Sequence, residues 1–423
     1  MYKDNSSTYG LLLFWLGAAS IIFFSNINIF SLSSPYTQTY EVLVLIFTPL
    51  IALLVITCLY IYFFKSFRLI FSYLLFFAIS ITSLFGLTEA LTGSHAISQN
   101  PFFYGLAFYS TSFAFIIYTN KLKKKTFLTA SNPLLLFTGP LAIFIKDIRY
   151  KSFSKRLKYF FPFVVLGLFL FQTIATPLSL SLGLIKYTDS ISSIVFAIIF
   201  ELFIYANFCG LSLIIYGLSG IFGFKVPLNF RQPFSSNNVI EFWRGWHLSL
   251  SIVLKNLFYL PAKKQFGSII AIISVFVASS LWHGVTINFL IWGLLHAICF
   301  IISLYFIKRN HKLLPFLLLL IGIVIGRMIF ADSNTERLYE KLLFNYGYAG
   351  IEYLVSLPTT FFLSLGLIFV FILSEYFMQY NKYFLTRNYK FYRLPFVQCI
   401  ILFITLITLS TSVGVDFAVY GQR

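Results

Sequence analysis

The sequence predicts an all-α membrane protein with many spans, on two observations. Its 423 residues are 59% hydrophobic and only 10% charged, and the mean hydropathy of +0.87 lies far outside the range of soluble globular proteins. Apolar runs of about 18 residues or more recur along the whole chain, and each is long enough to cross a bilayer as a helix. Because these runs are continuous, they exclude a transmembrane barrel, whose strands are alternating segments of roughly ten residues.

About eleven transmembrane helices are expected, because loops rich in Lys and Arg alternate with loops that lack them. Basic loops between membrane helices stay on the cytoplasmic side, so the alternation places the N-terminus inside and the C-terminus outside. The first run is too long for the core of a signal peptide and is interpreted as a span. The expected spans are 10–30, 41–64, 68–90, 101–118, 159–183, 190–222, 268–286, 289–307, 312–330, 353–377 and 395–413.

Two segments depart from this pattern. Residues 127–146 are apolar but have basic clusters on both sides, and Pro133, Gly139 and Pro140 interrupt them. A segment that begins and ends on one side is re-entrant or interfacial, and broken backbone at that depth survives only where protein buries it or a cavity adjoins it. Residues 225–265 are too polar to span and too apolar for a free loop, so we expect helices that lie in or dip into the cytoplasmic face.

Neither the net charge nor the cysteines indicate a nucleic-acid or metal site. The net charge of +18 comes from short basic clusters between apolar runs, as expected for cytoplasmic loops near anionic lipid head groups. All the cysteines lie within apolar runs without metal-ligand spacing, so they are interpreted as small core residues. They are Cys58, Cys209, Cys299 and Cys399.

The stretch EFWRGWHLSLS concentrates aromatic, charged and imidazole side chains in the second of these segments. Asn238 and Glu241 before it have the spacing of a capping box. On one continuous helix that starts there, His247 lies beside Trp243 on an apolar face, away from Arg244. The stretch is either an interfacial helix anchored by its aromatic residues or the edge of an active site.

A second histidine lies deeper in the expected membrane region. His283 closes an apolar run that begins near Ser268, about 20 Å from the cytoplasmic end at the rise of an α-helix. An ionisable side chain at that depth is a functional hypothesis by default, and a satisfied core histidine is the alternative. Asn288 precedes the return span, in which His296 shares a helix face with Trp292 and has either a supporting or a packing role.

Few other ionisable groups are expected inside the membrane. His95 and His311 lie in loops and are expected to be solvated. Glu201 and Arg327 are interpreted as the only charges well inside the expected spans, fewer than a proton-coupled transporter usually has.

Histidine instead occurs together with tryptophan. Four of the five tryptophans lie one to four residues from a histidine, which suits a lined tunnel that holds a general base. Neutral imidazole can take a proton from a hydroxyl near physiological pH. The tryptophans concerned are Trp243, Trp246, Trp282 and Trp292.

Around both histidines the sequence resembles the membrane-bound O-acyltransferase family, and within it the bacterial branch of alginate O-acetylation and teichoic acid D-alanine transfer proteins. The motif of this branch at its first histidine reads approximately FWRRWHISLS, against FWRGWHLSLS here. The second motif reads approximately GLWHGxxWxFxxWGLYHG, against SLWHGVTINFLIWGLLHA here. The likeness covers about residues 130–423 and is strongest over 205–300, where YANFCGLSLIIYGLSGIFGFKVPLNF also aligns with the pattern of the branch.

Three single-residue departures and one changed run accompany this resemblance, since the run after the first motif that reads WFRDY in the family reads VLKNLFY here. Asn207 and Leu213 stand where the family pattern has aspartates, and Gly245 stands where it has an arginine. These changes concern substrate handling or partner docking, and they leave both histidines in place.

The resemblance implies one membrane-embedded domain over residues 1–423, with peripheral spans over 1–125 and helices arranged in a ring around a central tunnel. It implies a bacterial cytoplasmic-membrane enzyme that takes an acyl group from a cytoplasmic thioester donor, acetyl-CoA or an acyl carrier protein, with no bound cofactor or metal. The acceptor would be a hydroxyl of an extracytoplasmic polysaccharide, of peptidoglycan or of a relay protein. The run FYLP favours acetyl, D-alanyl is the alternative acyl group, and a non-catalytic transporter or scaffold is the alternative function.

The resemblance also suggests roles for individual residues. His283 is expected to be the general base for the acceptor hydroxyl, and His247 is expected to orient the donor or polarise its carbonyl. Further residues are expected to line the tunnel or to support these two, namely Trp243, Arg244, Trp246, Trp282, Asn288, Trp292 and His296.

Overall fold

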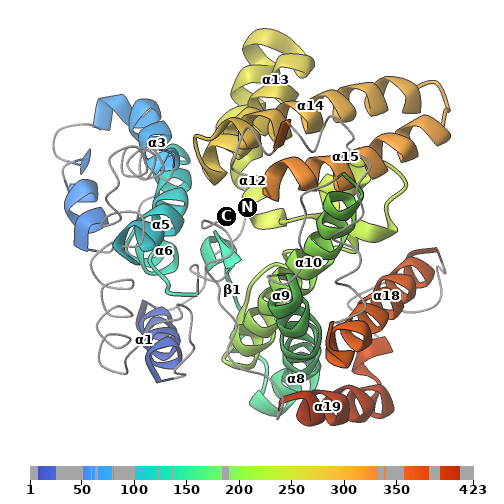
Figure 1. Cartoon of the computed structure of the whole chain (residues 1–423). Coiled ribbons are helices and arrows are strands. Elements are labelled where there is room, and N and C mark those ends of the chain that lie inside the picture. Colours follow the sequence, from blue (N-terminus) through green and yellow to red (C-terminus); the bar gives the residue numbers. More distant parts are fainter. Residues whose placement is uncertain are drawn as a thin grey trace, which may run out of the picture.

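The computed structural model of the chain consists of helices joined by short irregular segments (Figure 1). In the part of the chain that the structure describes, the only sheet is an antiparallel pair of two-residue strands, β1 (Lys146–Asp147) and β2 (Phe224–Lys225). The structure describes residues 8–24, 51–58, 60–61, 65–78, 80, 101–121, 123–134, 138–140, 142–182, 190–331, 338–339, 357–380 and 391–409.

Six helical runs within these ranges are long and apolar enough to cross a membrane. The prediction of a helical membrane protein is therefore confirmed, whereas the number of about eleven spans is not. Two shorter apolar helices, Tyr9–Ala18 and Pro395–Thr408, lie where the first and last spans are expected. The expected spans 41–64 and 68–90 lie partly outside the described residues.

Two of the spanning runs consist of several elements, because a π-helical turn lies inside each of them. The other four runs are single helices. The elements are α8 (Phe153–Leu168) with π-helix η4 (Phe169–Ala175) and α9 (Thr176–Leu182), then α10 (Ser190–Ile221), α12 (Leu248–Leu254) with π-helix η6 (Lys255–Tyr259) and α13 (Leu260–His283), α14 (Ile287–Ile307), α15 (Leu313–Ala331) and α18 (Thr359–Tyr380). Near the end of the chain, η8 (Phe391–Arg393) leads into α19 (Pro395–Leu409).

The N-terminal helices gather on one side of the molecule (Figure 1). They are α1 (Thr8–Phe24), η2 (Lys65–Phe67), α3 (Arg68–Phe76), α5 (Pro101–Tyr118) and α6 (Lys124–Ala130). A core that includes Phe76 and Phe113 joins this side to Leu257 and Trp282 of the third spanning run. The hydroxyl of Tyr73 also donates to the carbonyl of Leu257, at 2.8 Å. The N-terminal helices therefore support the helix that carries His283.

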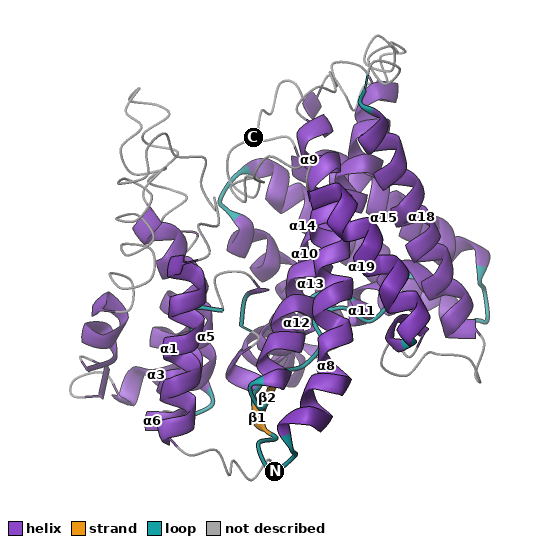
Figure 2. Cartoon of the chain, turned by 90° about the horizontal axis from the view of Figure 1, so that it is seen from below, coloured by secondary structure: helices purple, strands orange, loops and turns teal. Residues whose placement is uncertain are grey.

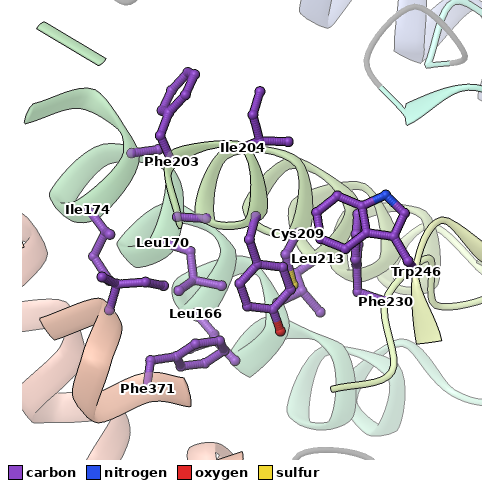
Figure 3. Packing of buried hydrophobic residues seen from close by; sticks show 14 of the residues in the cluster. Leu166, Leu170, Ile174, Phe203, Ile204, Cys209, Leu213, Phe230, Trp246 and Phe371 are labelled. Carbon is purple, nitrogen blue, oxygen red and sulfur yellow. The ribbon is translucent and has the colours of Figure 1, made fainter. Parts of the chain in front are cut away.

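The helix α10 forms the centre of the second core, where it packs against α8, η4 and α15 (Figure 3). Small residues allow the close approach, because a Cβ atom added at Gly167 of α8 would lie 2.6 Å from the carbonyl oxygen of Gly210 on α10. Close backbone contact of this kind is how membrane helices gain packing energy without a hydrophobic driving force between them. The core reaches Phe230 and Trp246, so it extends to the segment with the first histidine.

The third spanning run begins at Leu248, after η5 (Pro233–Ser235) and the short helix α11 (Val239–Gly245). It is kinked at Gly267, whose backbone is non-helical with φ of 85°. This kink lies between the segment 225–265 and the expected span 268–286, so the boundary between them agrees with the structure, while the interfacial position of the segment stays a prediction. Lys255, Lys263 and Lys264 before the kink have exposed side chains, and long basic side chains can keep their charge outside an apolar environment.

The segment 127–146 is irregular, as its prolines and glycine predict. After α6 the described backbone up to the short η3 (Ala142–Phe144) is helical only at Thr138, and residues 135–137 and 141 lie outside the described residues. Thr138 is fully buried, and Gly139 adopts a left-handed backbone with φ of 66°. Protein therefore buries the broken backbone, as the prediction requires.

Glu375 corrects the expectation that Glu201 and Arg327 are the only charges well inside the spans. Its side chain on α18 is fully buried, and one carboxylate oxygen accepts a hydrogen bond from the Tyr205 hydroxyl at 2.7 Å. The sequence places Glu375 close to the end of an expected span, where a solvated position is equally compatible with the pattern. Only the packing of α18 against the centre of the molecule decides its burial.

Candidate active site

His247 lies at a break between two helices, which corrects the expectation of one continuous helix from Asn238. The helix α11 begins with the expected cap, because the Asn238 side chain accepts from the backbone N–H of Glu241 at 2.9 Å. It ends at Gly245, and His247 has a left-handed backbone with φ of 44° before α12 starts at Leu248. A non-glycine residue in this conformation is uncommon and is typical of functional sites.

The imidazole of His247 caps the helix that follows it. Its Nδ1 atom accepts a hydrogen bond from the backbone N–H of Leu250 at 3.3 Å. In a neutral imidazole the proton is then on Nε2, and burial lowers the pKa of His247 to about 3, so the ring is neutral at physiological pH. The Nε2 atom is buried and has no hydrogen-bond partner among the described residues, which leaves an N–H group available to an acceptor.

Asn229 holds the backbone on both sides of His247. Its side chain donates to the carbonyl of Thr138 at 3.0 Å and accepts from the N–H of Ser249 at 3.1 Å. Its own carbonyl accepts from the N–H of Leu248 at 2.9 Å. Sequence analysis did not select Asn229 as a site residue, because its partners lie about 90 residues earlier and 20 residues later along the chain.

Gly139 lies directly against His247. A Cβ atom added to this glycine would lie 3.1 Å from Cε1 of the imidazole, which is tighter than normal packing. The left-handed backbone of Gly139 also favours glycine. The irregular segment 127–146 thus contributes one wall of the His247 site.

Replacing Asn229 with alanine is expected to lower the free energy of unfolding by about 2 to 4 kcal/mol, because it leaves buried backbone partners without hydrogen bonds. Thermal and chemical unfolding of the purified protein in mild detergent measures this. Asn256→Ala is a matched control, since the half-buried Asn256 bonds only the carbonyl of Ile252 within its own helix. Equal losses in the two variants would contradict the role of Asn229.

His283 is the last residue of α13, where Gly284 ends the helix with φ of 153°. Aromatic rings surround its imidazole, with centroids at 5.0 Å for Trp282, 5.5 Å for Trp292 and 4.9 Å for Phe330. His283 is nevertheless only half-buried, whereas His247 and His296 are buried. Of the three histidines at the site, His283 is therefore the least buried.

Trp282 connects the two histidines that sequence analysis selected as catalytic. Its ring lies 6.5 Å from the ring of His247 and 5.0 Å from the ring of His283 between centroids. The indole N–H donates to the hydroxyl of Thr111 on α5 at 2.8 Å. The N-terminal helices thus hold the tryptophan between the histidines, and the structure brings together the two motifs as expected.

The aromatic contacts continue beyond His283. Trp292 lies 5.5 Å from His283 and 5.1 Å from His296, and His296 lies 5.0 Å from Trp243. Rings from α11, α13 and α14 therefore form one connected series from His247 to Trp243. The Nδ1 atom of His296 and the indole N–H of Trp243 are buried without a hydrogen-bond partner in the described part of the chain.

Asn288 supports His283 through Phe330. Its side-chain amide is buried and donates to the carbonyl of Phe330 at 3.2 Å, and the ring of Phe330 packs edge-on against His283. Sequence analysis selected Asn288 but not Phe330, because an aromatic residue in an apolar run carries no local signal of function.

Glu201 and Arg327 form an ion pair beside His296. The guanidinium group also lies over the ring of Phe330 at 4.9 Å, so the pair joins α10 and α15 behind His283. A narrow cavity adjoins it, with a volume of about 10 Å³ for the centre of a water molecule, which is roughly the space for one water. Its lining is Glu201, Phe242, Trp243, Trp246, Trp292, His296, Gly322, Ile323 and Arg327.

Trp246 and Arg244 differ from the other selected residues. Trp246 packs on Phe242 and Phe230, at 5.4 Å and 5.0 Å between centroids, and reaches the site only through the cavity. Arg244 has an exposed side chain on α11, so the described contacts do not bring it to the histidines. Its role and the central tunnel remain predictions.

The three departures from the family pattern have different surroundings. A Cβ atom added at Gly245 would lie 2.7 Å from the carbonyl oxygen of Arg231, so a larger residue cannot occupy this backbone position without a shift. Leu213 is buried in the core around α10. Asn207 is buried too, and its side-chain oxygen has no partner among the described residues.

The arrangement of two histidine motifs agrees with a comparison against known protein families. Residues 11–313 match the membrane-bound O-acyltransferase family. The chain belongs to this family. The match begins earlier than the resemblance seen around the motifs, so it includes N-terminal helices that hold Trp282.

Individual members of the family are similar over shorter stretches. A teichoic acid D-alanyltransferase of Bacillus subtilis is 27% identical over 177 residues, which is 39% of this chain and 44% of that protein. A peptidoglycan O-acetyltransferase of Helicobacter pylori is 30% identical over 160 residues, 35% of this chain and 30% of that protein. A probable alginate O-acetylase of Pseudomonas aeruginosa is 31% identical over 155 residues, 34% and 30% of the two chains. The matched stretches thus span less than half the length of these relatives.

Proposed function

We propose that the protein is a membrane O-acyltransferase that moves an acetyl group from a cytoplasmic thioester donor to a hydroxyl of an extracytoplasmic polysaccharide or peptidoglycan. Membership of the family supports acyl transfer, and relatives named as O-acetylases of alginate and peptidoglycan support this group and these acceptors. The donor is acetyl-CoA or an acyl carrier protein. The enzyme would act in the bacterial cytoplasmic membrane, on its own or with an extracytoplasmic partner.

One observation carries the proposal. The half-buried imidazole of His283 is linked through Trp282 to the buried imidazole of His247, whose N–H group lacks an acceptor in the described structure. Acyl transfer needs one group that removes a proton from the attacking hydroxyl and one donor for the charge that develops on the carbonyl oxygen. The two imidazoles supply one of each.

In the proposed reaction, His283 accepts the proton of the acceptor hydroxyl while the oxygen attacks the thioester carbonyl carbon. A bond between carbon and oxygen forms and the bond between carbon and sulfur breaks. The sulfur leaves as the thiol after it takes the proton from His283. His247 donates from Nε2 to the carbonyl oxygen, and the rings of Trp282 and Trp243 exclude water, which would otherwise hydrolyse the acyl group.

D-Alanyl is the second candidate for the acyl group, because a teichoic acid D-alanyltransferase matches 39% of this chain. The run FYLP favours acetyl. A non-catalytic transporter or scaffold with the same fold is the remaining alternative.

Mass spectrometry of cell-envelope polymers from a deletion strain tests the function. We expect acetyl esters on one polymer to disappear and to return when the gene is restored. Loss of D-alanyl esters instead would identify the second candidate. Unchanged esters on every polymer would contradict acyl transfer and leave the transporter or scaffold.

A further inference from the structure

The corner formed by β1 and β2 concentrates positive charge away from the histidines. The strand pairing places Lys146 directly opposite Lys225, and like charges in this position are destabilising. Partial burial lowers the pKa of Lys225, and the charges of Lys151 and Lys146 lower it further. The lysine side chains thus lie close enough together to repel each other.

Arg156 of α8 adds a guanidinium group that lacks an acceptor. Its Nε and Nη1 atoms are buried and have no hydrogen-bond partner among the described residues. The group fits against the turn before β2, because a Cβ atom added at Gly223 would lie 2.0 Å from Nη1. Buried N–H donors of an arginine are costly unless an acceptor satisfies them.

The carboxylate of Asp147 lies close enough to Arg156 for their charges to attract, but its hydrogen bonds go to Arg149. Asp147 accepts from Arg149 through both the backbone N–H, at 2.9 Å, and Nη2, at 2.7 Å. The helix dipole gives the N-terminus of α8 a positive potential. No acidic residue in its first turn offsets this potential. The donors of Arg156 and the charges of the lysines therefore remain for an anion from outside the chain.

We propose that this corner binds a phosphate group through Arg156, Lys225, Lys146 and Lys151. A guanidinium group forms paired hydrogen bonds to phosphate oxygens, and lysines act as additional point charges. A phosphate monoester carries more charge and more acceptor oxygens than a carboxylate, whereas the phosphodiester of a lipid head group carries one charge, as a carboxylate does.

The position of the corner suggests two sources for the phosphate. Figure 2 shows β1 and β2 at one end of the bundle, where Arg156 of α8 lies against Gly223, and β2 ends four residues before Asn229, which holds His247. A soluble donor could therefore bind its phosphates here while its acyl group reaches the histidine. Exposed rings of Tyr150, Phe153 and Phe222 also suit a membrane interface, where the phosphate of a lipid head group would be the ligand.

Binding measurements on the full chain distinguish these sources. The purified protein is placed in nanodiscs of neutral phosphatidylcholine and titrated with coenzyme A as the soluble phosphate compound. In a second arm, nanodiscs contain phosphatidylcholine and phosphatidylglycerol. Native mass spectrometry then counts the phosphatidylglycerol molecules that the protein retains after release from these discs. Both arms use the wild type, Arg156→Gln, the exposed variant Lys225→Gln, and the matched control Lys312→Gln from the loop between α14 and α15. Thermal unfolding confirms that each variant is folded.

We expect Arg156→Gln and Lys225→Gln to weaken binding in one arm by about tenfold or more, the loss for one charge-assisted hydrogen bond, and Lys312→Gln to change neither arm. Weaker binding of coenzyme A by these two variants identifies a soluble compound as the source of the phosphate. A smaller number of retained phosphatidylglycerol molecules identifies the lipid head group. Wild-type affinity in both arms for both variants, or equal losses in the control, would overturn the site. Because neither arm requires acyl transfer, this result is independent of the proposed function.

Discussion

Replacing His283 with alanine is expected to lower acyl transfer by about a hundredfold to ten-thousandfold, the usual contribution of a general base. In the proposed mechanism this imidazole removes the proton of the acceptor hydroxyl, and it is the least buried of the three histidines at the site. Alanine removes the proton acceptor, whereas Trp282 and Trp292 still shape the surroundings. Polymer-bound acyl groups in a complemented deletion strain measure the loss.

His311→Ala is the matched control for this experiment, because His311 is exposed and follows α14. This variant should retain wild-type acylation. The His283 variant must also be inserted and expressed at the wild-type level, which immunoblotting of the membrane fraction checks. Unchanged acylation by such a His283 variant would rule out the proposed mechanism and favour a transporter, whose flux does not depend on this imidazole.

Arg327→Met is expected to destabilise the protein by about 3 to 5 kcal/mol, the usual effect of removing one partner from a buried ion pair. The Glu201 carboxylate would remain inside the bundle without a counter-charge. The guanidinium contact with Phe330, which packs on His283, would also be lost. Thermal and chemical unfolding in detergent measure the change.

A double-mutant cycle separates the ion pair from packing. The double variant Glu201→Gln and Arg327→Met removes both charges, so it should be more stable than Arg327→Met alone. Arg244→Met serves as a matched control, since this exposed arginine should change stability by less than about 0.5 kcal/mol. If the double variant is no more stable than Arg327→Met, the unpaired carboxylate of Glu201 is not the cause of the destabilisation.

Much of the helical framework could be predicted because the length of an apolar run is a local property. The expected spans 190–222, 289–307 and 312–330 agree with α10, α14 and α15 within two residues at each end. The expected start of the span 268–286 agrees with the kink at Gly267, although the helical run already begins at Leu248. Exposed lysines before the kink lower the hydropathy there, which is why the expected span starts after it.

The structure brings together most of the residues that the two motifs selected, and their roles in acyl transfer stay predictions. Both histidines, Trp282, Trp292 and Asn288 lie in the connected series or directly support it. Asn229, Gly139 and Phe330 were missed, because their partners are far away in sequence. The left-handed backbone of His247 was missed too, since helical periodicity continues through the break.

The sequence by itself determined the membrane class, the helical framework and the family, because hydropathy and motifs are properties of contiguous residues. The tertiary structure alone decided that His283 is half-buried while His247 is buried, and that Trp282 lies between them. It also decided that Glu201 meets Arg327 and that the donors of Arg156 lack an acceptor in the described structure. Burial and pairing of this kind depend on which helices, distant in sequence, pack together. A local sequence pattern does not predict this packing.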